Sequence, residues 1–192
     1  KQLIDIAKNS GCDAVKFQHR SKELYYLNDI NKYDLGTQYI LSEINRTSIT
    51  IDELQECCDL ASQLGLKNII TPFDEIALEE VLESNINLSA LKIASCDLTN
   101  QGLIKLCSQT KLPIIVSTGM SYEREIISTS YLLRNMLIEH AFLHCNSTYP
   151  SPIEDANLKY ISRLKDITKT IVGYSSHEGD MTIPLCAISH GA

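Results

Sequence analysis

Two lysine residues interrupt short apolar runs of this chain, where a positive charge is unexpected. Lys16 lies in the run 14–18 together with Gln18, and Lys92 lies in the run 90–95. Burying an ammonium group is unfavourable unless the group is paired or solvated in a cavity. Either lysine alone could bury only its stem and keep its charge at the rim. Two of them at the ends of neighbouring strands favour a binding site for an anion.

Hydroxyl and imidazole groups follow several of the other apolar runs. Each hydroxyl alone is often only a helix cap, but together they could bind phosphate or carboxylate oxygens: Ser95, Ser117, Thr118 and Ser175. His177 ends the last run and could act as a metal ligand or an acid–base group. We expect His144, inside the preceding run, to be a core histidine. These residues predict an anion-binding enzyme and leave its reaction open.

Six apolar runs must position these side chains, and they cover residues 14–18, 68–74, 90–95, 113–120, 141–146 and 171–177. Helical patterns separate most of them, with capping signals at Thr50, Asp74, Asn100 and Ser121, and the helix before the last run is expected from about Asn157. This alternation predicts a parallel α/β fold, in which the carboxyl ends of the strands meet at one rim. An open doubly wound sheet is the alternative to a barrel, although neither a dinucleotide fingerprint nor a phosphate-loop motif follows the first run.

The composition is typical of one globular domain. The chain has 192 residues, 44% of them hydrophobic, with a formal net charge of −7, which argues against nucleic acid or an anionic membrane as the partner. Seven cysteines without CxxC spacing favour reduced thiols and a cytoplasmic location. The long segment 19–48 is expected to be an active-site loop. The chain starts inside a helix pattern and stops before another strand, so we expect an excerpt of a longer protein.

Six short motifs occur together and in order, and together they resemble the sialic acid synthase (N-acetylneuraminate synthase) family. They are AVKFQ (14–18), TPFD (71–74), KIAS (92–95), STGM (117–120), HC (144–145) with YP (149–150), and GYS (173–175) followed by His177. The resemblance implies an α/β fold, the TIM (β/α)8 barrel, here incomplete without the first and last strands. Residues 1–192 would form a single partial catalytic domain, without the C-terminal antifreeze-like domain of the family.

The resemblance also implies a reaction and its participants. Phosphoenolpyruvate condenses with N-acetylmannosamine or a related N-acyl amino sugar to form sialic acid or another nonulosonic acid, and phosphate is released. The family requires a divalent metal, for which Mn²⁺ is the first expectation, with Mg²⁺ or Co²⁺ as alternatives. The parent protein would be a homodimer.

Site residues are implied in the same way. The positions that match phosphoenolpyruvate-binding residues are Lys16, Thr71, Lys92, Ser95, Ser117 and Ser175. Three further positions lie in strings associated with the sugar or the rim of the site: Asp97, Ser147 and Tyr149. Lys92 and His177 are the expected catalytic residues, and His177 is the expected metal ligand.

The chain departs from the family pattern beside two of these residues, and other functions remain open. Ser176 and Glu178 flank His177, where the family usually has aspartate and threonine, and Cys96 replaces a usual glycine. One alternative is an aldolase that uses Lys92 to form a Schiff base. Another is a degenerate barrel that binds a partner without catalysis. Borohydride trapping at Lys92 and Mn²⁺ titration would distinguish the three hypotheses.

Overall fold

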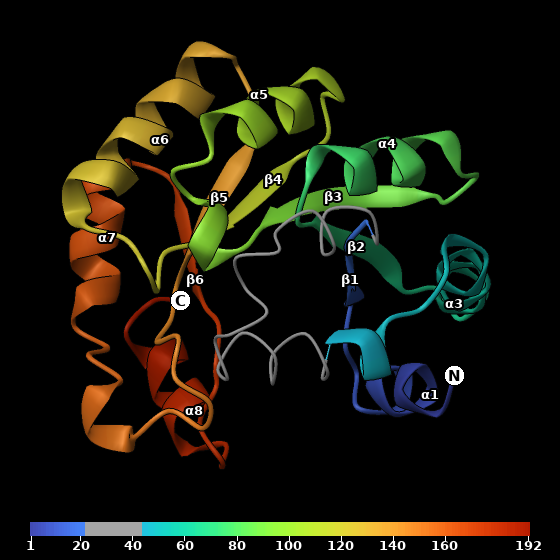
Figure 1. Ribbon diagram of the computed structural model, residues 1–192. Helices are drawn as coiled ribbons and strands as arrows, with labels where there is room; N and C mark the ends of the chain where they lie inside the picture. The colour runs from blue at the N-terminus through green and yellow to red at the C-terminus, as the bar shows by residue number, and fades with distance from the viewer. Residues whose placement is uncertain (22–43) are drawn as a thin grey trace, which may run out of the picture. The chain divides into compact units, whose positions relative to one another are not determined.

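A computed structural model describes residues 1–21 and 44–192 (Figure 1). These residues form two compact units, Lys1–Ser89 and Ala90–Ala192, which are considered in turn. The expected active-site loop falls largely on residues 22–43, outside the described part of the chain. The expectation of a single domain stays a prediction.

The first unit has two parallel strands and three helices in the order α1 (Gln2–Asn9), β1 (Ala14–His19), α3 (Ile51–Gln63), β2 (Lys67–Pro72) and α4 (Glu75–Glu83). In the register between β1 and β2, Lys16 lies opposite Ile69 and Gln18 lies opposite Thr71. Paired residues of parallel strands share a face of the sheet, and successive residues alternate between faces. Lys16, Gln18 and Thr71 therefore lie on the same face of this strand pair.

The opposite face of the pair forms the core of the first unit. Ile70 of β2 packs with Leu54 and Cys58 of α3 and with Val81 of α4, and Phe17 of β1 contacts this cluster. Fully burying an aliphatic side chain of this size contributes roughly 1.5–3 kcal/mol. The core therefore fixes which face of the strands keeps the polar side chains.

Both helix starts predicted in the first unit are confirmed. The Thr50 hydroxyl accepts a hydrogen bond from the Glu53 N–H at 3.2 Å, and the Glu53 carboxylate accepts one from the Thr50 N–H at 2.8 Å. This reciprocal capping box satisfies two N–H groups that the helix itself leaves unpaired. The Asp74 carboxylate accepts a hydrogen bond from the Ala77 N–H at 2.7 Å and begins α4.

The second unit alternates strands and helices, and its strands β3 to β6 pair in parallel in chain order. Its elements are β3 (Leu88–Ile93, with its first residues in the first unit), η3 (Ser95–Asp97), α5 (Gln101–Gln109), β4 (Ile114–Ser117), α6 (Glu123–Asn135), β5 (His140–His144), η4 (Ile153–Asp155), α7 (Tyr160–Thr168), β6 (Ile171–Tyr174) and α8 (Thr182–Ser189). The Asn100 side chain accepts a hydrogen bond from the Leu103 N–H at 3.1 Å, so the predicted cap of α5 is confirmed.

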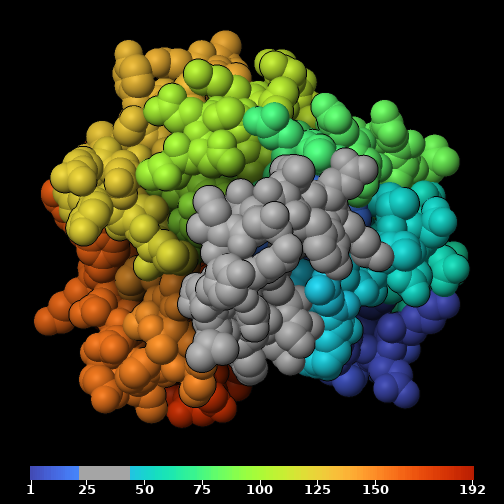
Figure 2. All heavy atoms as spheres, viewed as in Figure 1, coloured from blue at the N-terminus to red at the C-terminus, as the bar shows by residue number. Residues whose placement is uncertain are grey.

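Helices α6 and α7 lie side by side in this unit (Figure 1). The Ser130 hydroxyl of α6 donates to the carbonyl of Thr168 at the end of α7 over 3.2 Å. The space-filling view shows the side chains of the two helices in contact, the yellow of α6 against the orange of α7 (Figure 2). Among the described residues, no helix is both long enough and apolar enough to cross a membrane.

Two helix starts in the second unit differ from the sequence-based expectation. Helix α7 begins at Tyr160 instead of about Asn157, because Asn157 has a φ of 45°, which an α-helix does not allow. At α6 the expected cap Ser121 is not used. Instead, the Glu125 carboxylate accepts a hydrogen bond from the Tyr122 N–H at 2.7 Å.

Candidate functional site

A lysine and a serine from neighbouring strands form the centre of the candidate site in the second unit. The Lys92 ammonium of β3 donates a hydrogen bond to the Ser117 hydroxyl, the last residue of β4, over 2.7 Å. Ser117 is only 3% exposed. Lys92 lies opposite Ile115 in the register, so Lys92 and Ser117 share one face of the strands. A half-buried ammonium beside a hydroxyl presents donors to an anion from one side.

Three strand ends converge next to this pair. The Ser95 hydroxyl, after β3, accepts a hydrogen bond from the Gly119 N–H at 3.2 Å and lies 3.4 Å from the Cys145 sulfur. A Cβ on Gly119 would lie 2.5 Å from the Ser147 hydroxyl oxygen and 3.0 Å from both the carbonyl oxygen and the sulfur of Cys145. Only glycine therefore fits where the loop after β4 passes the loop after β5.

Two of the predicted substrate-binding residues lie in the first unit. Thr71 is 1% exposed, and its hydroxyl has no hydrogen-bond partner among the described residues. Lys16 lies on the same face of the strand pair. Partial loss of water lowers the pKa of its ammonium group, yet much of the residue's surface stays exposed. Among the described residues, this face therefore offers a lysine and a hydroxyl without a hydrogen-bond partner.

His177 is held against the loop that follows β5. Its Nδ1–H donates a hydrogen bond to the carbonyl of Asn146, and its own carbonyl accepts one from the Ser151 N–H at 2.9 Å. The ring of Tyr149 packs on the imidazole, with 4.3 Å between ring centroids. In the neutral imidazole, a proton on Nδ1 leaves the lone pair on Nε2, the atom that a metal ligand would use.

The Glu178 carboxylate closes the turn that carries His177. It accepts hydrogen bonds from the Tyr174 hydroxyl at 2.5 Å, the Ser176 hydroxyl at 2.8 Å and the His177 N–H at 3.2 Å. Partial burial would raise the pKa of Glu178, but these bonds outweigh it and hold the pKa below its usual value. Burial, and then the hydrogen bond to Glu178, raise the pKa of the Tyr174 hydroxyl.

A complete metal centre is not formed by the described residues. Across residues 1–21 and 44–192, no group of three or more His, Cys, Asp or Glu side chains is placed to bind a metal ion. His177 nevertheless fits as one ligand, because a backbone carbonyl orients its ring in the manner common for metal-binding histidines. The expected metal site therefore stays a prediction, with one candidate ligand in place.

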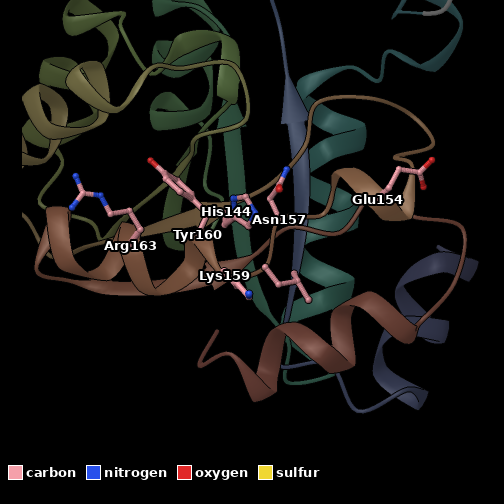
Figure 3. Close-up of a pocket in the computed structure, with 7 residues that line it drawn as sticks. His144, Glu154, Asn157, Lys159, Tyr160 and Arg163 are labelled. Atoms are coloured by element: carbon pink, nitrogen blue, oxygen red, sulfur yellow. The ribbon is translucent and has the colours of Figure 1, made fainter.

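A separate pocket of about 720 Å³ opens beside His144 (Figure 3). Leu143 pairs with Ser117 in the register, so its neighbour His144 points to the opposite face from the Lys92–Ser117 pair. The Nε2–H of His144 donates to the carbonyl of Ala156 over 2.8 Å, and its ring packs near those of Tyr160 and Tyr174. The prediction of a structural histidine is confirmed.

The family model described as "NeuB family" matches residues 3–192 of the chain. The chain belongs to the NeuB family. It is 36% identical over its whole length to an uncharacterized protein of Methanocaldococcus jannaschii, of which it covers 54%. It is 31% identical to an N,N'-diacetyllegionaminic acid synthase of Legionella pneumophila, again over its whole length and 56% of that protein. The chain thus spans about half the length of the curated relatives it matches.

A solved NeuB relative has the same fold. This N-acetylneuraminic acid (sialic acid) synthetase from Leptospira borgpetersenii, in complex with citrate, is 28% identical and superposes with a TM-score of 0.88 over 100% of this chain and 64% of its own. Together with the parallel strands and alternating helices, this likeness confirms the prediction of an α/β fold of the TIM-barrel type. The recognition of the family from six short motifs is also confirmed.

The structure of this NeuB chain connects predicted site residues of the second unit in separate contacts. Lys92 bonds to Ser117, Ser95 and Ser147 both lie against Gly119, and Tyr149 packs on His177. Asp97 lies in η3, where its carboxylate accepts a bond from the Cys96 thiol at 3.3 Å. The Ser175 N–H donates to the carbonyl of His144 at 2.9 Å. That Lys16 and Thr71 share one cavity with this group stays a prediction.

Sequence reasoning missed three residues that contact this candidate site of the NeuB chain. The Gly119 N–H and the Cys145 sulfur both contact Ser95, and the Asn146 carbonyl orients His177. Gly119 and Cys145 lie inside the quoted motifs, so their place in the strings was a usable signal. Asn146 contributes only its backbone carbonyl, which every residue has, so the residue type gives no signal.

Proposed function

We propose that the intact protein is a nonulosonic acid synthase that condenses phosphoenolpyruvate with an N-acyl amino sugar. The observation that carries this proposal is the cluster of Lys92, Ser117, Ser95 and the Gly119 N–H at adjoining strand ends. One cation and two hydroxyls suit a compact anion with several oxygens, and the Gly119 N–H holds the Ser95 hydroxyl in place. Relatives named as legionaminic acid, pseudaminic acid and N-acetylneuraminate-9-phosphate synthases support the same reaction class.

In the proposed reaction, the enol carbon of phosphoenolpyruvate bonds to the aldehyde carbon of the open-chain sugar. Water adds to the carbon that bears the phosphate, and the carbon–oxygen bond to phosphate then breaks, which leaves a 2-keto acid. The Lys92 ammonium and the neighbouring hydroxyls bind anionic oxygens and stabilise the charge that leaves with phosphate. A divalent metal, when bound, polarises the aldehyde and orients water. His177, whose Nε2 has no partner among the described residues, is the proposed ligand on this chain, and Mn²⁺ is the proposed ion.

Phosphate release tests the proposal. The intact protein is incubated with phosphoenolpyruvate, Mn²⁺ and a panel of N-acyl amino sugars that includes N-acetylmannosamine, its 6-phosphate and diacetamido sugars. We expect turnover with one of them and its loss in Lys92→Met, while Lys105→Met, a change of an exposed lysine on α5, retains it. Absence of turnover with every sugar would refute the proposal.

The same protein separates the alternatives. If borohydride traps a keto acid on Lys92, the Schiff-base aldolase replaces the synthase. If Mn²⁺ binding is unaffected by His177→Ala, the metal role of His177 is wrong. A cytoplasmic location and a homodimeric parent belong to this proposal as further predictions, to be checked by cell fractionation and by the mass of the intact protein in solution.

A further inference from the structure

A single carboxylate spans the turn that carries the candidate metal ligand. Glu178 binds the Tyr174 hydroxyl at the end of β6, the Ser176 hydroxyl just before His177, and the N–H of His177 itself. The two carboxylate oxygens of Glu178 therefore connect the end of β6 to the side chain of Ser176 and the backbone of His177. Hydrogen bonds to an ionised acceptor are shorter and stronger than neutral ones, so the Glu178 carboxylate holds the turn in one conformation.

The orientation of His177 depends on the shape of that turn. The Nδ1–H reaches the Asn146 carbonyl, and the His177 carbonyl accepts from the Ser151 N–H at 2.9 Å. Both contacts are made to the loop after β5, and both use atoms whose position is set by the backbone around His177. A turn that relaxed without Glu178 would move the imidazole away from its carbonyl partner. Nδ1 would then lose the bond that keeps Nε2 unprotonated.

We propose that Glu178 is the positioning residue of His177, which sets the tautomer and direction of the imidazole without touching substrate or metal. This inference rests on the proposed function, which gives His177 its role as a ligand. In metal-binding sites, partners that orient a histidine affect metal affinity by about 10–100-fold. Glu178 acts one step further out, through the backbone of the turn.

Two variants with a matched control test the inference in the intact protein. Glu178→Ala removes all three hydrogen bonds. Glu178→Gln keeps the shape of the side chain, but its NH2 group replaces one acceptor oxygen and faces donors of the turn. The control is Glu139→Ala, a change of an exposed glutamate that precedes β5 at the other end of the strand. The first measurement is the imidazole tautomer of His177 in the metal-free protein, from long-range ¹H–¹⁵N spectra. The second is the Kd for Mn²⁺.

We expect the wild type and the Glu139→Ala control to show one tautomer, with the proton on Nδ1. Glu178→Ala should show a mixture and bind Mn²⁺ about 10-fold more weakly, with Glu178→Gln between the two. Because the tautomer is read without metal, it reports on positioning even if the metal assignment is wrong. An unchanged His177 tautomer in a folded Glu178→Ala protein would overturn the inference.

The outcomes also separate this inference from the proposed function. If His177→Ala abolishes Mn²⁺ binding while Glu178→Ala binds as the wild type does, the role of Glu178 is refuted and the synthase proposal stands. If the wild type binds no Mn²⁺, the metal role fails and the tautomer alone decides on Glu178. Should Glu178→Ala not fold, Ser176→Ala, which removes one of the three bonds, must show the same tautomer shift in smaller degree, and its absence would refute the inference.

Discussion

Replacing Gly119 with alanine probes the convergence of strand ends most directly. The added Cβ would lie 2.5 Å from the Ser147 hydroxyl oxygen, and 3.0 Å from both the carbonyl oxygen and the sulfur of Cys145. The Ser147 side chain can rotate away, but the Cys145 carbonyl belongs to the backbone and cannot. The loop must therefore move, and with it the Gly119 N–H that donates to Ser95.

Overpacking of this kind costs about 1–3 kcal/mol. For a chain of about 150–250 residues, each kcal/mol lowers Tm by about 2–4 °C. Displacing the donor to Ser95 should also raise KM for phosphoenolpyruvate in the proposed reaction. Thermal unfolding and phosphate release measure the two effects. The matched control is Gly179→Ala, because a Cβ there meets nothing within 4 Å.

The reasoning also predicts a partial rescue. Ser147→Gly removes the closest contact, so the double variant with Gly119→Ala should regain part of the lost Tm, while the contact with the Cys145 carbonyl remains. If Gly119→Ala unfolds at the same temperature as Gly179→Ala, the geometry described for this crossing is wrong.

Three further predictions concern other parts of the chain. Thr50→Ala removes the capping box of α3 and should lower the free energy of unfolding by about 1 kcal/mol, measured by urea denaturation. Ser117→Ala removes the hydroxyl that accepts from Lys92 and should raise KM for phosphoenolpyruvate while the fold is retained by circular dichroism. Burial raises the pKa of Cys107 to about 12. An unfolded thiol has a pKa of about 8.5. The buried Cys107 thiol should therefore contribute its full stabilisation below that pH and lose it as the pH rises toward 12, measured by denaturation at each pH.

Each of these has a control within the same chain. Thr47→Ala lies just before the capping box and should leave α3 stable. A Ser128→Ala change on the exposed surface of α6 should leave KM unchanged. Cys12 is exposed, so a Cys12→Ser variant should keep the alkaline loss of stability, whereas Cys107→Ala should reduce it. Equal behaviour of a variant and its control would contradict the corresponding prediction.

Strands and helix caps were predictable because their signals are local. Apolar runs separated by helical patterns show strands, and a threonine with glutamate three residues later shows a capping box, as at Thr50. The positions at which the strands end were harder to predict from the sequence. The run 171–177 was predicted as one unit, yet β6 ends at Tyr174, because hydrogen bonding to the neighbouring strand and not residue polarity decides where a strand stops.

The contacts of the candidate site could be predicted only in part from the sequence. Lysine and hydroxyl residues at strand ends indicated an anion site, and motif order indicated the family. The bond from His177 to a backbone carbonyl and the three bonds to Glu178 depend on how two loops meet in space. Glu178 departs from the family pattern, but nothing in the local sequence indicates which donors it binds.

The buried hydroxyl of Thr71 has a consequence for how this position could evolve. A buried polar atom without a partner, as here among the described residues, weakens the free protein by about 1–3 kcal/mol. Valine has nearly the same shape and would remove that penalty. A lineage under selection for heat tolerance alone should therefore drift toward valine at this point. Persistence of the threonine in such lineages would mean that its hydroxyl gains a hydrogen-bond partner from outside the described residues, such as an oxygen of a bound ligand.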